Sequence, residues 1–120
     1  MSTEGPTPLP LNPRVLMILL AFAEGPAHGY EIKKRAEARS GGGVQLDAGS
    51  LYRSIAQLLD QDLIEEVEGG PGADSGDSRR RYYGLTPHGR ELAAAEARRL
   101  AGLVEYAAFN GLIDAPGAAQ

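Results

Sequence analysis

The chain of 120 residues contains no cysteine, no tryptophan and only two histidines. Without cysteine it has no disulfide framework, no thiol nucleophile and no zinc site built on thiolates. His28 and His88 have no ligand-type neighbours at metal spacing, so we expect both to be structural and no metal to be bound. The lack of cysteine is compatible with the cytoplasm, and we expect a cytoplasmic protein.

Patterns that mark common enzyme families are missing as well. The sequence has no P-loop, no G-x-G-x-x-G, no defensible Ser-His-Asp arrangement and no carboxylate pair set among apolar residues. The glycines Gly41 to Gly43 follow a helical pattern rather than a strand, so we interpret them as the end of that helix. We therefore expect no catalytic residues, no cofactor and no enzymatic activity.

No hydrophobic run is long enough to cross a membrane. The apolar segment VLMILLAFA, Val15 to Ala23, has nine residues and no suitably placed Ala-x-Ala cleavage site. It is therefore too short for a membrane span and unlike a secretory signal. We expect a buried helix there and no membrane partner.

The charges point in two directions. There are 12 Lys and Arg against 16 Asp and Glu, and the net charge of −4 by itself argues against a nucleic-acid partner. The cations are clustered, however. Five lie between Lys33 and Arg53 with only two acids among them, and Arg79 to Arg81 form a second basic cluster.

The length favours one domain. Residues 1–12, with three prolines, are expected to form a flexible arm. Proline at the first turn predicts a helix over residues 13–24, and a second helix should run from about His28 to Arg39.

A third helix is expected after Asp47, which can cap the amides of Gly49 and Ser50. Its apolar residues recur at the spacing of one helix face: Leu51, Ile55, Leu58 and Leu59. We predict that this face is buried. The opposite face is polar and left for another partner: Ser50, Arg53, Ser54 and Gln57.

A short strand at about residues 63–68, a ten-residue Gly-rich loop and a return strand at 79–85 predict a hairpin. Thr86-Pro87 then starts a last helix that ends near Asn110, before a flexible tail over residues 111–120. The predicted fold is mostly α with a small β-hairpin (α+β). It comprises a winged helix-turn-helix over residues 13–85 and a C-terminal dimerisation helix over 86–110.

In a winged helix-turn-helix the third helix enters the major groove of DNA and the hairpin reaches the neighbouring backbone. Arginine suits guanine, glutamine suits adenine, and further cations contact phosphates. The candidate DNA-binding residues are Lys33, Lys34, Ser50, Tyr52, Arg53, Gln57, Arg79, Arg80 and Arg81. Alternatives stay open: Tyr52 as a half-buried packing residue, Arg53 as a solvated surface residue, and the arginine cluster paired with Asp74 and Asp77.

The last helix carries an apolar stripe that either completes the core or forms a dimer seam, and its length favours the seam. The candidate interface residues are Leu92, Leu100, Leu103, Val104 and Ala107. Glu96 falls within this stripe, and we expect it to be either exposed at the rim or paired with Arg99 across the interface.

Three signatures resemble the PadR family of bacterial transcriptional regulators: AEGPAHGYEI, LDAGSLYRSIAQLLDQDLIEE and RRRYYGLTPHGRE. The resemblance covers about Val15 to Ala108. It implies a homodimeric repressor with third helices and wings on DNA and with exchanged C-terminal helices. Tyr52 and Tyr83 match tyrosines that the family carries in the recognition helix and the wing.

The chain resembles the short subfamily with a single C-terminal helix, and it departs from many relatives in having Arg53 after Tyr52. Some short members bind planar drugs between tryptophans, whereas this chain has Leu100 at that place, which puts such binding in doubt. We predict a dimeric repressor that binds an imperfect palindrome and is released by a small-molecule inducer. The alternative is a winged-helix module that docks another protein without binding DNA.

Overall fold

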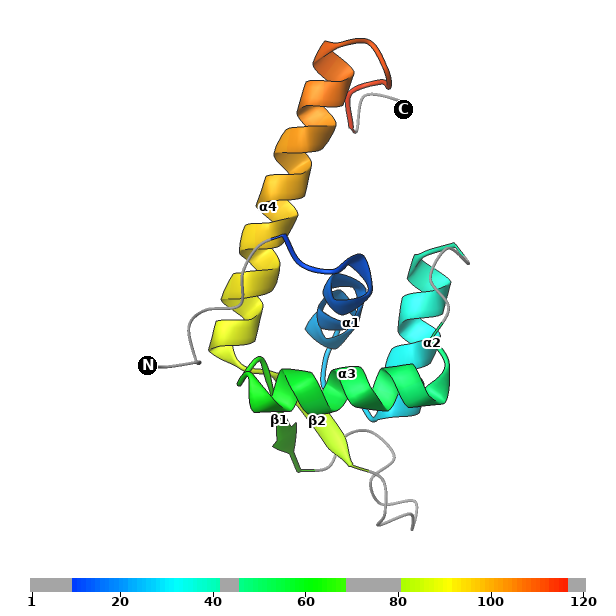
Figure 1. Cartoon of the computed structure of the whole chain (residues 1–120), viewed down its shortest axis with the longest axis vertical. Coiled ribbons are helices and arrows are strands. Elements are labelled where there is room, and N and C mark those ends of the chain that lie inside the picture. The colour runs from blue at the N-terminus through cyan, green and yellow to red at the C-terminus, as the bar shows by residue number, and fades with distance from the viewer. Residues whose placement is uncertain (1–9, 42–45, 69–80, 117–120) are drawn as a thin grey trace.

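The computed structural model describes residues 10–41, 46–68 and 81–116. Within these ranges the chain forms four helices and two strands, arranged as Figure 1 shows. Their bounds are α1 Pro13–Ala23, α2 Gly29–Arg39, α3 Ala48–Asp60, β1 Ile64–Val67, β2 Tyr82–Leu85 and α4 Pro87–Phe109. The predicted fold class is confirmed: the protein is mostly helical, with an antiparallel hairpin and a long C-terminal helix.

Each helix begins where a polar side chain accepts a hydrogen bond from its first turn. Proline follows the cap in α1 and α4, where its missing N–H costs nothing. The capping residues are Asn12, His28, Asp47 and Thr86. These local signals explain why the observed helix starts agree closely with the sequence.

Helix α1 lies in the middle of the domain, between α4 and α2 in Figure 1, and packs against both of them and against β2. Its buried side chains include Ile18, Leu19 and Phe22. Because α1 is apolar on most of its surface, it can contact several elements at once, as its sequence predicts.

Helix α3 buries Leu51, Ile55 and Leu58, as expected, but Leu59 is 37% exposed. The prediction that Leu59 belongs to the core was therefore wrong. The three buried residues define a narrow stripe, and Leu59 lies at its margin in the last turn of the helix.

The hairpin pairs β1 with β2 in the antiparallel register Ile64↔Leu85 to Val67↔Tyr82. The segment before α2 also joins it, because Ala27 and Tyr83 exchange backbone hydrogen bonds of 3.0 and 2.9 Å. This bridge, which the sequence reading missed, ties the wing to the start of α2. The predicted loop and the beginning of the predicted return strand lie in residues 69–80, outside the described ranges.

The start of α4 is fixed against the turn that follows α3. The Thr86 hydroxyl donates to the carbonyl of Asp62 at 2.6 Å, and the Thr86 N–H donates to that of Leu63 at 3.1 Å. At Gly89 an added Cβ would lie 2.0 Å from the Leu63 oxygen. Close backbone approach therefore requires the glycine in the Leu-Thr-x-x-Gly signature.

Two residues just before α1 also belong to the packed part of the domain. Leu11 is buried and Asn12 caps α1, so both belong to the packed domain, while residues 1–9 of the expected arm lie outside the described ranges. None of the helices within the described ranges is long and apolar enough to span a membrane.

Candidate nucleic-acid interface

The outer side of α3 is divided into a fully exposed strip and a half-buried flank. Arg53 and Gln57 are exposed, whereas Ser50 and Ser54 are half-buried. The sequence placed these four side chains on one equivalent face. The structure distinguishes them by burial, although all four line one hollow beside the start of α1.

Arg53 is held by a short chain of hydrogen bonds on the first turn of α3. Its Nη2 donates to the Ser50 hydroxyl oxygen at 3.2 Å, and that hydroxyl donates to Oδ2 of Asp47 at 3.1 Å. The other Asp47 oxygen accepts the Ser50 N–H at 2.8 Å as the helix cap. The bonds from the Ser50 backbone and then its hydroxyl hold the pKa of Asp47 below its ordinary value.

Tyr52 lies on the other side of the exposed strip and is 55% exposed. Its ring rests on the start of α2, where a Cβ at Gly29 would lie 3.0 Å from the Tyr52 Cε1. Tyr52 therefore packs with one part of its ring and leaves the rest open to a ligand. Tyr83, in the wing, is buried, and that burial is the main cause that raises the pKa of its hydroxyl.

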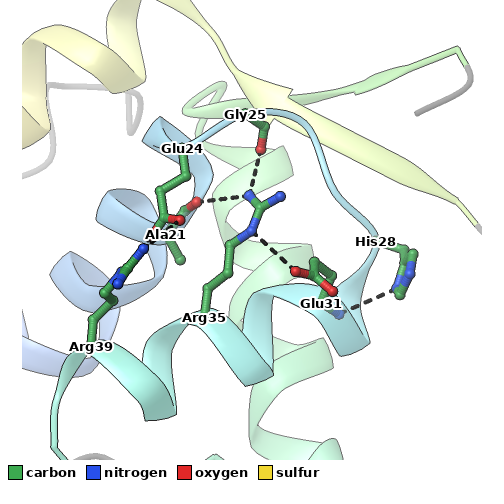
Figure 2. Close-up of polar contacts among 7 residues, drawn as sticks. All are labelled: Ala21, Glu24, Gly25, His28, Glu31, Arg35 and Arg39. Atoms are coloured by element: carbon green, nitrogen blue, oxygen red, sulfur yellow. Dashed lines mark hydrogen bonds and ion pairs between the residues drawn. The ribbon is translucent and has the colours of Figure 1, made fainter. Parts of the chain in front are cut away.

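Two cations of α2 hold the end of α1, as Figure 2 shows. The Arg35 Nη1 donates to the carbonyls of Ala21 at 3.0 Å and Gly25 at 2.7 Å. Arg39 pairs with Glu24 at 3.1 Å, and this hydrogen bond is the main reason that the pKa of Glu24 is lowered. These two arginines thus have intramolecular roles at the α1–α2 junction.

The two lysines predicted to approach DNA lie on the same helix but differ in their surroundings. Lys33 pairs with Glu37 at 2.9 Å, and Glu37 also accepts the Leu46 N–H at 3.3 Å. Lys34 is exposed, with its Nζ 5.6 Å from the centre of the Tyr30 ring. Of the two lysines, Lys34 is therefore the more accessible to an anion from outside the domain.

The wing carries one described member of the predicted arginine cluster. Arg81 is exposed, and its Nη1 lies 3.3 Å from Oε1 of Glu66 on the paired strand. Exposed ion pairs of this kind are weak, so Arg81 can exchange its partner for a phosphate. Arg79, Arg80 and the proposed partners Asp74 and Asp77 lie outside the described ranges.

A polar hollow of about 210 Å³ lies between the outer face of α3 and the first turn of α1. The residues that line it are Asn12, Arg14, Val15, Ser50, Arg53, Ser54 and Gln57. The sequence reading missed Arg14 because it treated α1 only as a buried helix. Proline at the preceding position was the available signal, since it places Arg14 in an exposed first turn.

The predicted dimer seam of α4 spans two environments. Leu92 and Leu100 pack in part against the chain's own core, Ala107 is half-buried, and Leu103 and Val104 are exposed. The sequence reading missed further exposed apolar side chains beyond them: Tyr106, Phe109, Leu112 and Ile113.

The turn after α4 keeps part of this apolar surface in place. Gly111, with φ of 77°, donates its N–H to Ala108 at 3.0 Å, and Leu112 donates to Ala107 at 3.0 Å. This pair of bonds is a Schellman motif. It extends the exposed apolar surface past the last helical residue.

Glu96 contradicts both expectations made for it. Its side chain is 1% exposed, so it is not at a rim, and it pairs with Arg99 of the same helix at 2.7 and 2.8 Å. Its Oε2 also accepts the Leu11 N–H at 3.1 Å. The contact was hidden from the sequence because it joins residues 85 positions apart.

The described residues were also compared with the requirements of a metal site. Within residues 10–41, 46–68 and 81–116, no three His, Cys, Asp or Glu side chains gather as metal ligands. His28 caps α2 and stacks edge-on against Tyr82 at 5.3 Å, a structural role.

Solved structures of similar shape come from transcriptional regulators. A PadR family regulator from Clostridium difficile has a TM-score of 0.66 and 20% identity over 85% of this chain and 100% of that one. A transcriptional regulator from Clostridium thermocellum has a TM-score of 0.62 and 23% identity, over 83% of this chain and 92% of that one. A mutant MarR from E. coli has a TM-score of 0.64 and 19% identity, over 90% of this chain and 70% of that one. At these identities the likeness shows the winged-helix fold.

Sequence comparison adds the family. An uncharacterized 37.1 kDa protein in transposon TN4556 of Streptomyces fradiae is 39% identical over 92 residues, 77% of this chain and 24% of that protein. The chain thus spans about a quarter of the length of this relative. The model of the transcriptional regulator PadR-like family matches residues 15–95. The chain therefore belongs to the PadR-like family, whose members are transcriptional regulators and not enzymes.

Proposed function

We propose that the protein is a dimeric repressor that binds double-stranded DNA at an imperfect palindrome in the bacterial cytoplasm. The observation that supports this most is the outer side of α3. There Arg53 and Gln57 are exposed opposite the buried stripe, with side chains long enough to reach base edges.

The proposed contacts divide by chemistry. Arg53, Gln57 and Tyr52 face the major groove, and the remaining cations contact phosphates on either side. The full set is Lys33, Lys34, Ser50, Tyr52, Arg53, Gln57, Arg79, Arg80 and Arg81. Within it Ser50 orients Arg53, since its hydroxyl already bonds both Arg53 and Asp47.

Dimerisation through α4 would place two copies of α3 in successive major grooves, about 34 Å apart. The exposed apolar side chains at the C-terminal end of α4 support this, because such a surface is costly to leave in water. The proposed interface comprises Leu92, Leu100, Leu103, Val104 and Ala107, extended by Tyr106 and Phe109. Leu92 and Leu100 would lie at its inner end, where they also contact the domain core.

Release by a small-molecule inducer is the part of the proposal that rests on family membership alone. An inducer must bind one arrangement of the two subunits more tightly than the other to change DNA affinity. The chain has no tryptophan, so stacking of a planar drug between tryptophans is not its mode of binding.

The net charge of −4 favours a second candidate function, in which the winged helix docks another protein through α3 or the wing. Capture of genomic DNA distinguishes the DNA-binding repressor from the protein-docking module. Purified protein is incubated with fragmented DNA of its own genome, and retained fragments are sequenced.

A repressor retains a few fragments that share a palindrome, and the logarithm of their affinity falls linearly with that of salt, by about 0.9 per neutralised phosphate. Retention of no specific fragment at moderate salt, with an intact fold, would favour the protein-docking module. If the retained fragments share only a single half-site and no palindrome, the protein does not bind DNA as the proposed dimer.

A further inference from the structure

We propose that the hollow between α1 and α3 seats a phosphate of the DNA backbone, with Arg14 as its principal ligand. This inference rests on the proposed DNA binding and adds α1 to the interface. The sequence reading assigned DNA contacts to α2, α3 and the wing only.

The charge of the hollow supports an anionic occupant. Arg14 and Arg53 both line it, together with Val15 and neutral polar side chains, and no acidic side chain does. Among the described residues, no carboxylate pairs with the Arg14 side chain. The Arg53 guanidinium is already linked through the Ser50 hydroxyl to the Asp47 carboxylate, so Arg14 is the cation of the hollow that an added anion would neutralise. Guanidinium binds phosphate well because its planar N–H groups match two phosphate oxygens.

The dimensions of the groove explain why a phosphate would arrive there. An α-helix with its side chains is about 10–12 Å across, and the major groove of B-DNA is about 12 Å wide. When α3 fills the groove, one sugar-phosphate strand must therefore pass along each side of it. The hollow lies beside α3, where its outer face meets the first turn of α1, and it is lined by the half-buried Ser50 and Ser54 as well as by Arg53 and Gln57.

The position of Arg14 is set by the fold rather than by chance. Asn12 accepts the Arg14 N–H at 2.8 Å and fixes the first turn of α1. Leu16, two residues later, is buried in the core, so the turn cannot swing away from α3. The backbone that carries the Arg14 side chain is therefore fixed before binding, which lowers the entropy lost when Arg14 binds a phosphate.

The test compares Arg14→Gln and Arg14→Lys with Arg98→Gln, which removes the same charge from an exposed position on α4 that does not line the hollow. Binding to the captured operator and to a scrambled duplex is measured by fluorescence anisotropy over a salt series. Circular dichroism and thermal melting establish that each variant is folded.

We expect Arg14→Gln to weaken binding to both duplexes by the same factor and to reduce the salt slope by about 0.9. Arg14→Lys should keep the slope near that of the wild type, and Arg98→Gln should change nothing. An Arg14→Gln slope equal to that of Arg98→Gln would overturn the proposal. So would a loss confined to the operator, because it would mean that Arg14 reads a base.

A further measurement separates the DNA backbone from a free phosphate compound as the source of the anion. Melting temperatures are compared in inorganic phosphate and in chloride at equal ionic strength, without DNA. If phosphate stabilises the wild type but not Arg14→Gln, while the DNA salt slopes agree, the hollow holds a free anion and the DNA assignment is wrong. If the wild type binds neither duplex, the proposed function itself fails.

Discussion

The hydroxyl of Ser50 accepts a hydrogen bond from Arg53 Nη2 at 3.2 Å and so connects the exposed arginine of α3 to the residue one turn before it. Because the same hydroxyl donates to the Asp47 cap, the arginine is linked to the start of the helix. A guanidinium ordered before binding loses less entropy when it meets DNA. Ser50 is thus better described as a residue that positions Arg53 than as an independent DNA contact.

A double-mutant cycle tests this role. Ser50→Ala and Arg53→Ala should each weaken operator binding, and the double variant should lose less than the sum of the two losses. The coupling expected from one hydrogen bond to a charged group is about 1–2 kcal/mol, measured as operator affinity by anisotropy. Strictly additive losses would mean that Ser50 acts on DNA by itself.

Two glycines of α4 give opposite expectations for the same substitution. Gly89→Ala should destabilise the protein by about 3 kcal/mol, since the new Cβ would meet the backbone oxygen of Leu63, which cannot move aside. Gly102→Ala has open space around it and should stabilise α4 by about 0.5–1 kcal/mol. Urea unfolding of both variants checks this pair, and equal effects would show that the junction between β1 and α4 is looser than described.

The exposed end of α4 should control the oligomeric state. Phe109 is 86% exposed, so Phe109→Ser costs an isolated chain little but removes an aromatic anchor from the proposed interface. We expect the dimer to weaken by about 2 kcal/mol, roughly 30-fold in dissociation constant, by analytical ultracentrifugation. The matched control is Leu20→Ser, an exposed apolar residue of α1, which should leave the dimer unchanged. Equal weakening by both variants would argue for a different interface.

Glu96 should make stability depend on pH in the acid range. Its hydrogen bond with Arg99 is the main cause that lowers the pKa of the Glu96 carboxyl from the ordinary value of 4.5. A carboxyl with a lowered folded-state pKa contributes stability that is complete above 4.5 and is lost as the pH falls through the lower, folded value.

Glu96→Gln keeps an oxygen that can accept the Leu11 N–H but removes the charge. It should therefore lower stability at pH 7 and flatten the loss of stability below pH about 4.5. Urea midpoints between pH 7 and pH 3 measure the difference. A wild type and a variant that lose stability in parallel would show that other carboxylates cause the acid sensitivity.

The order of elements and the helix starts could be predicted because their signals are local. Asp47 and Thr86 cap the helices that immediately follow them. The spacing of the apolar residues from Leu51 to Leu58 likewise predicts a buried helix face without reference to any other element. The Gly89 requirement was present in a signature but unexplained until the Leu63 carbonyl was seen beside it.

The uses of individual charges could not be predicted, because they depend on residues distant in sequence. Arg35 belongs to a basic run, yet it binds the end of α1, and Glu96 meets the N–H of Leu11 across the whole chain. A helical wheel orders side chains around one axis but does not say which side a neighbouring helix covers. For that reason it could not separate Ser54 from Arg53, or show that Arg14 lies beside both.

The claim that α3 and the wing hold DNA is tested most directly by one comparison of operator binding. Wild-type protein is compared with a variant in which Arg53 and the arginine cluster of the sequence, Arg79, Arg80 and Arg81, are all alanine, after circular dichroism has shown both to be folded. The wild type should prefer the operator to a scrambled duplex by about 1000-fold or more. The variant should lose most of its affinity and show a shallower salt slope. Tight operator binding that survives all four substitutions would contradict the proposed interface.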